Sequence, residues 1–157
     1  MAGTELFSEE LIFIKQDLRD RAALFDWFSG HMMARGYVED SYRESISKRE
    51  EQFPTGIQTT TVGVAIPHAD PENLKKPFIA VVIPRNSIEF EPMGNAEECI
   101  QARLIFMLGV LKNGDQVIAL QKLMNLLSND CAVQQLLQEK ECKAILEIIQ
   151  KNFNQRE

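Results

Sequence analysis

Two long apolar runs constrain the fold of this chain more than any other feature of its sequence. They read FIAVVIP, residues 78–84, and ARLIFMLGVL, residues 102–111. Neither run alternates apolar with polar residues, as a strand with one face in water does. We therefore predict two β-strands that are covered on both faces, which requires helices on each side of a sheet.

Shorter patterns predict the remaining elements. Further strands are expected at residues 11–14, 62–66 and 88–90, and Asn113-Gly114 is expected to form the turn after the strand at 102–111. Apolar residues at spacings of three and four predict a helix from Leu18 to Met32 that Gly36 ends.

The helices after the first one differ in character. Residues 39–51 are expected to form a charged, mostly solvent-facing helix, broken at residues 53–56. Three helices are expected at the C-terminal end. The apolar face of the first comprises Val117, Leu120, Leu123, Met124 and Leu127. The second, shorter helix contains Val133, Leu136 and Leu137, and the last contains Ile145, Ile148 and Ile149. The predicted fold class is α/β: a single domain over residues 1–157, with a mixed sheet of about five strands flanked by helices on both faces.

Composition and charge exclude several functional classes. The chain has 157 residues, 45% of them hydrophobic, and a formal net charge of −6, which argues against a nucleic-acid partner. Residues 1–15 lack the pattern of a signal peptide, and no stretch reaches the ~18 apolar residues of a membrane span. We expect a cytoplasmic protein with no direct membrane insertion.

Three cysteines, Cys99, Cys131 and Cys142, have no zinc-ligand spacing and are expected to be reduced thiols. Cys131 stands near a predicted helix start, where a thiol pKa can fall, but we assign it a packing role. Phosphate-binding loops, dinucleotide-binding glycine motifs and a nucleophile elbow are absent from the sequence. No metal and no cofactor are therefore predicted.

His68 is one of only two histidines, and it follows Pro67 where the predicted strand 62–66 ends. Proline fixes its own φ and lacks an N–H, so the ring is attached to a stiff segment at a sheet end, where α/β proteins often bind ligands. A neutral imidazole, with an ordinary pKa of about 6.5, carries a lone pair and needs no second base to act as a nucleophile. The alternative is a loop histidine that only makes a local hydrogen bond.

Two motifs give the chain a family resemblance. REEQFPTGI, residues 49–57, followed by VGVAIPH, residues 62–68, resembles the fructose/mannitol-type enzyme IIA domain of the sugar phosphotransferase system (PTS). The hallmark of that family is an Arg-Glu pair, a Thr-Gly turn and a G-[IV]-A-[IV]-P-H segment, which occur here in that order. The resemblance extends from Gly36-Tyr37-Val38 to the C-terminal helices, and it implies a mixed sheet with helices on both sides.

The resemblance implies a catalytic role for His68 and phosphoryl-binding roles for three other residues. Arg49 matches the arginine beside the phosphorylated histidine, and a guanidinium can bind two phosphoryl oxygens at once. Thr55 matches the Thr-Gly turn, where its hydroxyl donates to the phosphoryl group or serves only the turn, and Gly56 allows close backbone approach. Gln116 stands where many members have a second histidine, so it can donate a hydrogen bond but cannot titrate near neutral pH.

The remaining polar residues near the motifs receive structural interpretations. His31 lies on the first predicted helix, and we interpret it as structural or surface-exposed. Asp70 is interpreted as a turn residue before Pro71, because its charge would repel a phosphoryl group.

By resemblance, His68 accepts a phosphoryl group from phospho-HPr and passes it to a cysteine of a IIB partner, while a membrane IIC component meets the sugar. REEQFPTGI together with Gln116 is more similar to the galactitol branch than to the mannitol or fructose branches. An alternative function is regulatory: related IIA-like domains sense phosphorylation and control transcription factors or transporters. A degenerate scaffold, with His68 kept only for packing, is a third interpretation.

Overall fold

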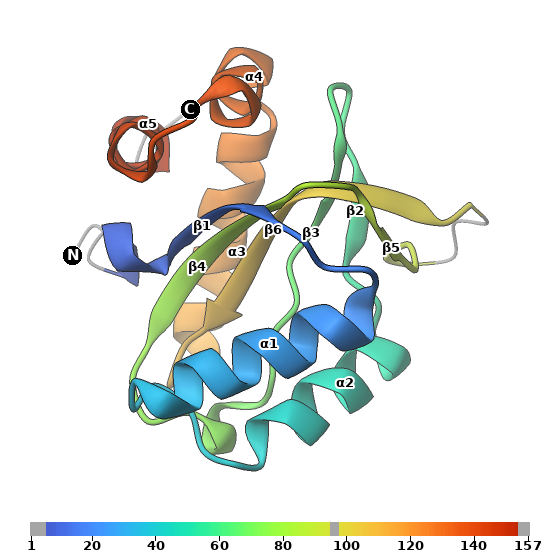
Figure 1. Cartoon of the computed structure of the whole chain (residues 1–157), viewed down its shortest axis with the longest axis vertical. Coiled ribbons are helices and arrows are strands. Elements are labelled where there is room, and N and C mark those ends of the chain that lie inside the picture. Colours follow the sequence, from blue (N-terminus) through green and yellow to red (C-terminus); the bar gives the residue numbers. More distant parts are fainter. Residues whose placement is uncertain (1–5, 95–97, 154–157) are drawn as a thin grey trace.

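A six-stranded mixed sheet forms the centre of the computed structural model, which describes residues 6–94 and 98–153 (Figure 1). The strand order is β1-β4-β6-β3-β2, and β5 pairs with β6 off this path. β1 is parallel to β4 and β3 to β6, whereas the other pairs are antiparallel. The strands are β1 (Ile12–Gln16), β2 (Gly56–Gln58), β3 (Gly63–Ala65), β4 (Phe78–Pro84), β5 (Ile88–Phe90) and β6 (Ile100–Gly109).

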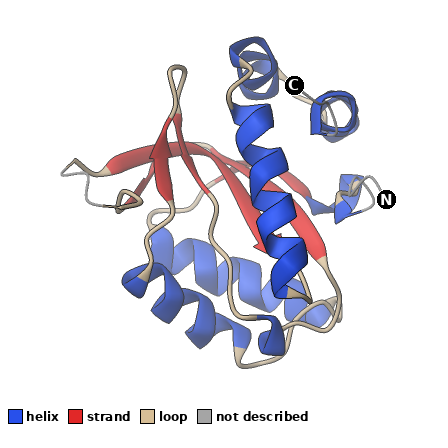
Figure 2. Cartoon of the chain, turned by 180° about the vertical axis from the view of Figure 1, so that it is seen from behind, coloured by secondary structure: helices blue, strands red, loops and turns tan. Residues whose placement is uncertain are grey.

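Helices cover both faces of this sheet, as the two apolar runs predict. On one face lie α1 (Arg21–Ala34) and α2 (Tyr42–Gln52). On the other lie α3 (Asn113–Leu127), α4 (Asp130–Gln138) and α5 (Cys142–Phe153), and Figure 2 shows α3 from that side. Successive residues of β4 alternate between the two cores: Ile79 and Val81 pack toward α3–α5, and Ala80 and Val82 toward α1 and α2. The predicted α/β class with a mixed sheet is confirmed. That one domain spans residues 1–157 stays a prediction.

Several local predictions are also confirmed. β4 and β5 begin and end at the predicted residues. Gly36 follows the end of α1 with φ of +80°, and its N–H donates to the carbonyl of Met33. That left-handed conformation suits glycine at a helix C-terminus.

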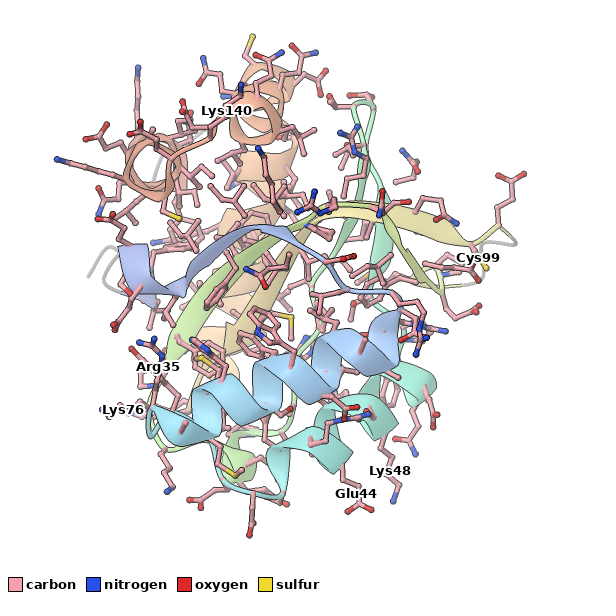
Figure 3. All side chains as sticks on the ribbon, in the orientation of Figure 1. Arg35, Glu44, Lys48, Lys76, Cys99 and Lys140 are labelled. Carbon is pink, nitrogen blue, oxygen red and sulfur yellow. The ribbon has the colours of Figure 1, made fainter. Side chains whose placement is uncertain are left out.

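Most residues of α2 are at least partly exposed, as predicted, but the helix also has a buried stripe that the sequence analysis did not identify. Tyr42, Ile46 and Glu50 are buried at a spacing of four residues, so one stripe of the helix packs against the protein. Glu44 and Lys48 point outward from the opposite side (Figure 3). The sequence pattern did not indicate this stripe, because one of its three buried residues is a glutamate and the helix is rich in charged residues.

Two further expectations are wrong, and one strand is missing from the prediction. β2 was not predicted, because a three-residue strand has too few residues to show a period. On α3, Val117 and Met124 are 57% and 44% exposed, because the buried face comprises Ala119, Leu123, Leu126 and Leu127 instead. Cys131 does not pack in the core but is exposed on the first turn of α4.

Among the described residues, no helix has both the length and the apolar character needed to cross a bilayer.

Candidate functional site

The segment that carries His68 leaves the sheet at the shared carboxyl end of β3 and β6. β3 ends at Ala65, and the chain continues beside β6, where the N–H of Leu108 donates to the carbonyl of Pro67 over 3.0 Å. His68 itself forms an isolated bridge with Leu108. In open α/β sheets this edge is where ligands commonly bind.

The His68 ring has a defined tautomer in this position. Its Nδ1 lies 2.9 Å from the carbonyl oxygen of Ile66. A carbonyl oxygen only accepts, so Nδ1 carries the proton and the lone pair is on Nε2. No described residue forms a hydrogen bond with Nε2, and the residue as a whole is 9% exposed. The nitrogen with the lone pair is therefore the one left for chemistry.

The charge state of His68 follows from its surroundings. Burial lowers the pKa of the imidazole below its ordinary value of 6.5, the hydrogen bond to Ile66 opposes this, the Arg49 charge lowers it further and Asp70 raises it. The net direction is downward, so the ring is mostly neutral at pH 7. A neutral ring is the nucleophilic form.

Arg49 reaches this site from the last turn of α2. Its Nη1 forms an ion pair with the Asp70 carboxylate at 2.9 Å, and its guanidinium carbon lies 5.1 Å from the centre of the Phe53 ring. The Nε of Arg49 is buried and has no hydrogen-bond partner among the described residues. The Arg49 side chain is 32% exposed, so its guanidinium N–H groups outside the ion pair can bind an anionic group while Asp70 holds the side chain in place.

Thr55 and Glu50 form a buried pair beneath this segment. The Thr55 N–H donates to one Glu50 carboxylate oxygen at 2.9 Å, and the Thr55 hydroxyl donates to the other at 2.9 Å. Both residues are 3% exposed. Burial raises the pKa of the Glu50 carboxyl to about 7, although the two hydrogen bonds from Thr55 and the Arg21 charge oppose the rise.

Gly56 permits a close approach between backbones, as the sequence predicts. A Cβ at this position would lie 2.6 Å from the carbonyl oxygen of Glu91 and 2.9 Å from Ile100 Cγ1. Gly56 also pairs with Ala65, which joins the end of α2 to the end of β3. Its small size thus lets the start of β2 lie against the Glu91 backbone and the Ile100 side chain.

Gln116 lies shortly after the carboxyl end of β6, at the same end of the sheet as His68. It lies in the first turn of α3, shortly after β6 ends at Gly109, and is partly exposed. Its N–H donates to the carbonyl of Lys112 at 3.1 Å. No side-chain hydrogen bond joins it to His68 or Arg49 in the described part of the chain. The phosphoryl-binding roles of Arg49, Gln116 and Thr55 stay predictions.

The sequence of the chain matches a known protein family. Residues 5–152 match the family described as the phosphoenolpyruvate-dependent sugar phosphotransferase system, EIIA 2. The chain belongs to this family. The expected class, a phosphotransferase component, is confirmed at that level.

Three curated relatives of this EIIA chain are similar over different lengths. The galactitol-specific EIIA component of Escherichia coli (strain K12) is 27% identical over 101 residues, which cover 64% of this chain and 66% of that protein. The fructose-specific EIIABC component of Bacillus subtilis (strain 168) is 29% identical over 95% of this chain and 23% of its own length. The transcriptional regulator ManR of the same organism is 31% identical over 71% of this chain and 15% of its own length.

Solved structures share the fold of this EIIA chain. The crystal structure of IIA mannitol from Escherichia coli superposes with a TM-score of 0.74 at 21% identity, covering 90% of this chain and 97% of that one. The complex of enzyme IIAMTL and phosphorylated enzyme IIBMTL from the same organism gives 0.74 at 22% identity, covering 93% and 99%. These similarities establish the fold.

Sequence reasoning missed two interactions in the site. Asp70 does precede the short 3-10 helix η3 (Pro71–Asn73), but it also pairs with Arg49, across 21 residues of sequence. Glu50 was not singled out, because a glutamate in the charged run KREE is usually solvated. Its spacing of four residues from Ile46 and eight from Tyr42 was the signal that could have identified it.

The other histidine lies in a different environment. The His31 ring packs edge-on against Phe13 at 5.0 Å between ring centres and lies 5.8 Å from Trp27. Burial lowers the pKa of His31, the Arg35 charge lowers it further and Glu10 raises it. The contacts of this ring are with α1 and β1 and not with the segment of His68.

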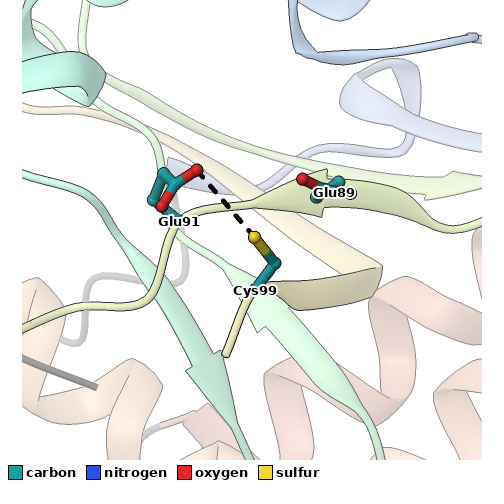
Figure 4. A group of neighbouring side chains, drawn as sticks. All are labelled: Glu89, Glu91 and Cys99. Atoms are coloured by element: carbon teal, nitrogen blue, oxygen red, sulfur yellow. Dashed lines mark hydrogen bonds between the residues drawn. The ribbon is translucent and has the colours of Figure 1, made fainter. Parts of the chain in front are cut away.

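One group of side chains has the composition of a metal site but does not support one. Glu89, Glu91 and Cys99 place their ligand atoms within 4.8 Å of one another, and Cys99 Sγ lies 3.9 Å from Glu91 Oε2 (Figure 4). All three are exposed. Exposed acidic groups of this kind are common in proteins without a bound ion. We assign no metal to this group.

Replacing Glu50 with glutamine should change how stability depends on pH. The native pKa of about 7 lies above the ordinary 4.5, so Glu50 supports folding below pH 4.5 and loses that contribution as pH rises through 7. Glutamine does not titrate. The free energy of unfolding of Glu50→Gln relative to wild type should therefore increase from pH 5 to pH 8, as measured by urea denaturation. His68 titrates in both proteins, so its contribution cancels in the difference between their free energies of unfolding. If that difference were constant with pH, the prediction would be contradicted.

Proposed function

We propose that this EIIA chain is a phosphoryl carrier that accepts a phosphoryl group from phospho-HPr on His68 and passes it to a IIB partner. The observation that supports this most is the His68 ring itself. Its Nδ1 is fixed by the Ile66 carbonyl, and its Nε2 carries a free lone pair at the end of the sheet. Family membership supplies the reaction class.

The proposed reaction has two balanced steps. The Nε2 lone pair of His68 attacks the phosphorus of the donor phosphohistidine, an N–P bond forms, and the bond to the donor ring breaks with its electron pair returning to that ring. A thiolate of the IIB partner then attacks the same phosphorus, and the Nε2 lone pair is restored as the N–P bond breaks. Positioning and charge stabilisation dominate such transfers, because the protein performs little covalent chemistry beyond them.

Three residues are proposed to assist. Arg49 stabilises the charge on the phosphoryl oxygens through the donors that Asp70 does not occupy. Gln116 donates a hydrogen bond from the start of α3 without exchanging a proton. Thr55 would have to leave Glu50 to donate directly to the phosphoryl group, so its role in the turn is favoured over a direct contact.

The proposed setting is the uptake of a sugar alcohol, with galactitol favoured. The support is the similarity to a galactitol-specific EIIA component, together with the motif REEQFPTGI and Gln116. A cysteine-bearing IIB component would be the acceptor, as a IIA–IIB complex is known for a protein of this fold, and a membrane IIC component would act downstream. We place the chain in the cytoplasm, bound to neither nucleic acid nor membrane.

A second function has one observation in its favour. The transcriptional regulator ManR is 31% identical to this chain over 111 residues. In that case the phosphorylation of His68 would control binding to a regulatory target, and the phosphoryl group would not be passed to a IIB cysteine. Transfer from the phosphorylated chain to a IIB component distinguishes the two functions.

The test is intact mass after incubation with phosphoenolpyruvate, enzyme I and HPr. We expect wild type to gain one acid-labile phosphoryl group and His68→Ala to gain none. His31→Ala removes the other histidine of the chain and should be phosphorylated like wild type. No gain by a folded wild-type protein, with active HPr present, would refute the carrier function.

A further inference from the structure

A hydrogen-bonded chain connects the buried Glu50 to the His68 ring. The Thr55 hydroxyl donates to the Glu50 carboxylate and accepts the N–H of Ile66 over 3.3 Å. The carbonyl of the same Ile66 accepts the Nδ1 proton of His68 over 2.9 Å. Two buried residues, Thr55 and Ile66, thus connect Glu50 to the proposed nucleophile.

The Ile66 N–H needs this side chain because its strand partner has ended. β2 pairs with β3 from Gly56 opposite Ala65 to Gln58 opposite Gly63, so β2 offers no paired residue opposite Ile66. Ile66 is fully buried, and a buried N–H that lacks an acceptor destabilises the folded state. The Thr55 side chain, one residue before β2 begins, supplies the acceptor that the backbone lacks.

The direction of the Ile66 carbonyl follows from three constraints. Ile66 precedes Pro67, which restricts it to extended conformations. Thr55 holds its N–H on one side, and the Leu108 N–H holds the next carbonyl, that of Pro67. The Ile66 carbonyl lies between these two hydrogen bonds and is directed at His68 Nδ1.

We propose that Thr55 and Glu50 are positioning residues for His68, which act through the Ile66 peptide to hold the ring in its Nδ1–H tautomer. Glu50 orients the Thr55 hydroxyl so that its lone pair faces the Ile66 N–H, and the Ile66 carbonyl then fixes the proton on Nδ1. This inference rests on the proposed function, since it assigns a reason why Nε2 is the attacking nitrogen. Neither residue touches the phosphoryl group in this role.

The first test is the tautomer itself, read from the ¹⁵N imidazole signals of His68 in the unphosphorylated full chain. Wild type should show one tautomer, protonated at Nδ1. Thr55→Val, which keeps the shape but removes the hydroxyl, should show a mixture of both, and Thr55→Ser should restore the single tautomer. A single Nδ1–H tautomer in Thr55→Val would overturn the proposal.

The second test is the rate of phosphoryl acceptance from phospho-HPr. Thr55→Val should react about tenfold more slowly at saturating donor, because part of the lone pair is on the wrong nitrogen and the ring is less fixed. Thr55→Ser should recover the rate. Equal loss in both variants would overturn the proposal, as would a Thr55→Val rate within twofold of wild type.

Thr59→Val is the matched control. Among the described residues, the Thr59 hydroxyl makes hydrogen bonds only within the turn between β2 and β3: it accepts from the N–H groups of Thr61 and Val62 and donates to the Val62 carbonyl. The same substitution there should lower stability but change neither the His68 tautomer nor the rate. An equal effect of Thr59→Val would mean that loosening the hairpin is enough, and would overturn the specific role of Thr55.

A measurement on wild type covers the case in which Thr55→Val does not fold. Hydrogen exchange of the Ile66 amide should be as slow as that of the amides within β3, because its acceptor is held by Glu50. Exchange at the rate of an exposed loop would overturn the proposal. Both NMR measurements need no partner protein, so they stand even if wild type accepts no phosphoryl group and the carrier function fails.

Discussion

Arg49→Gln should lower the rate of phosphoryl transfer to His68 by about 100-fold, a typical loss for one charged or oriented transition-state donor. The guanidinium is already held at the site by Asp70 and by the ring of Phe53, with Nε unsatisfied. Glutamine keeps a polar side chain but removes the charge and the forked donors. Arg49→Lys keeps the charge but not the forked donors, so its transfer rate should be about tenfold below wild type, between those of wild type and Arg49→Gln. Single-turnover kinetics with phospho-HPr measures both.

A matched control lies on the same helix. Arg43 forms an ion pair with Asp26 of α1, whereas Arg49 pairs with Asp70, two residues after His68. Arg43→Gln should leave the rate unchanged. A second readout follows from electrostatics: because the Arg49 charge lowers the pKa of His68, Arg49→Gln should raise that pKa in an NMR titration. A rate within threefold of wild type in Arg49→Gln would contradict the phosphoryl-binding role.

The elements that sequence predicts best are those whose pattern allows one interpretation. β4 is an unbroken apolar run and β5 a strict alternation, and both are predicted to the residue. β2 has three residues and forms because β3 lies beside it, which no local pattern shows. α3 has more apolar residues than it buries, so their spacing does not show which of them are buried. Val117 and Met124 were therefore predicted to lie on the buried face but are exposed.

The candidate site divides in the same way. Pro67 and the preceding strand locate His68 at a sheet end, which is a local property of the sequence. The partners of Arg49 and Ile66 are set by tertiary structure: Asp70 reaches Arg49 across 21 residues and Thr55 reaches Ile66 across 11. The tautomer of His68 likewise depends on a carbonyl whose direction is known only once β2, β3 and β6 are in place.

Gly63→Ala should destabilise the protein by about 3 kcal/mol, the upper part of the usual range for overpacking a filled interior. Gly63 begins β3, and a Cβ there would lie 2.3 Å from the carbonyl oxygen of Gln101 and 2.9 Å from Ile100 Cγ2. The first of these atoms is backbone, so β3 and β6 must separate where they pair. For a chain of this length such a loss lowers Tm by about 6–12 °C.

The opposite sign is expected for the same substitution in α1. Gly30 lies inside this helix, and a Cβ added there would meet nothing within 4 Å. Gly30→Ala should therefore stabilise the protein by about 0.5–1 kcal/mol, through helix propensity and a less flexible unfolded chain. Urea denaturation followed by circular dichroism measures both variants. Since β3 leads directly to His68, Gly63→Ala should also slow phosphoryl acceptance, whereas Gly30→Ala should not. Changes in stability of the same sign in the two variants would show that contact with β6 does not decide the cost at Gly63.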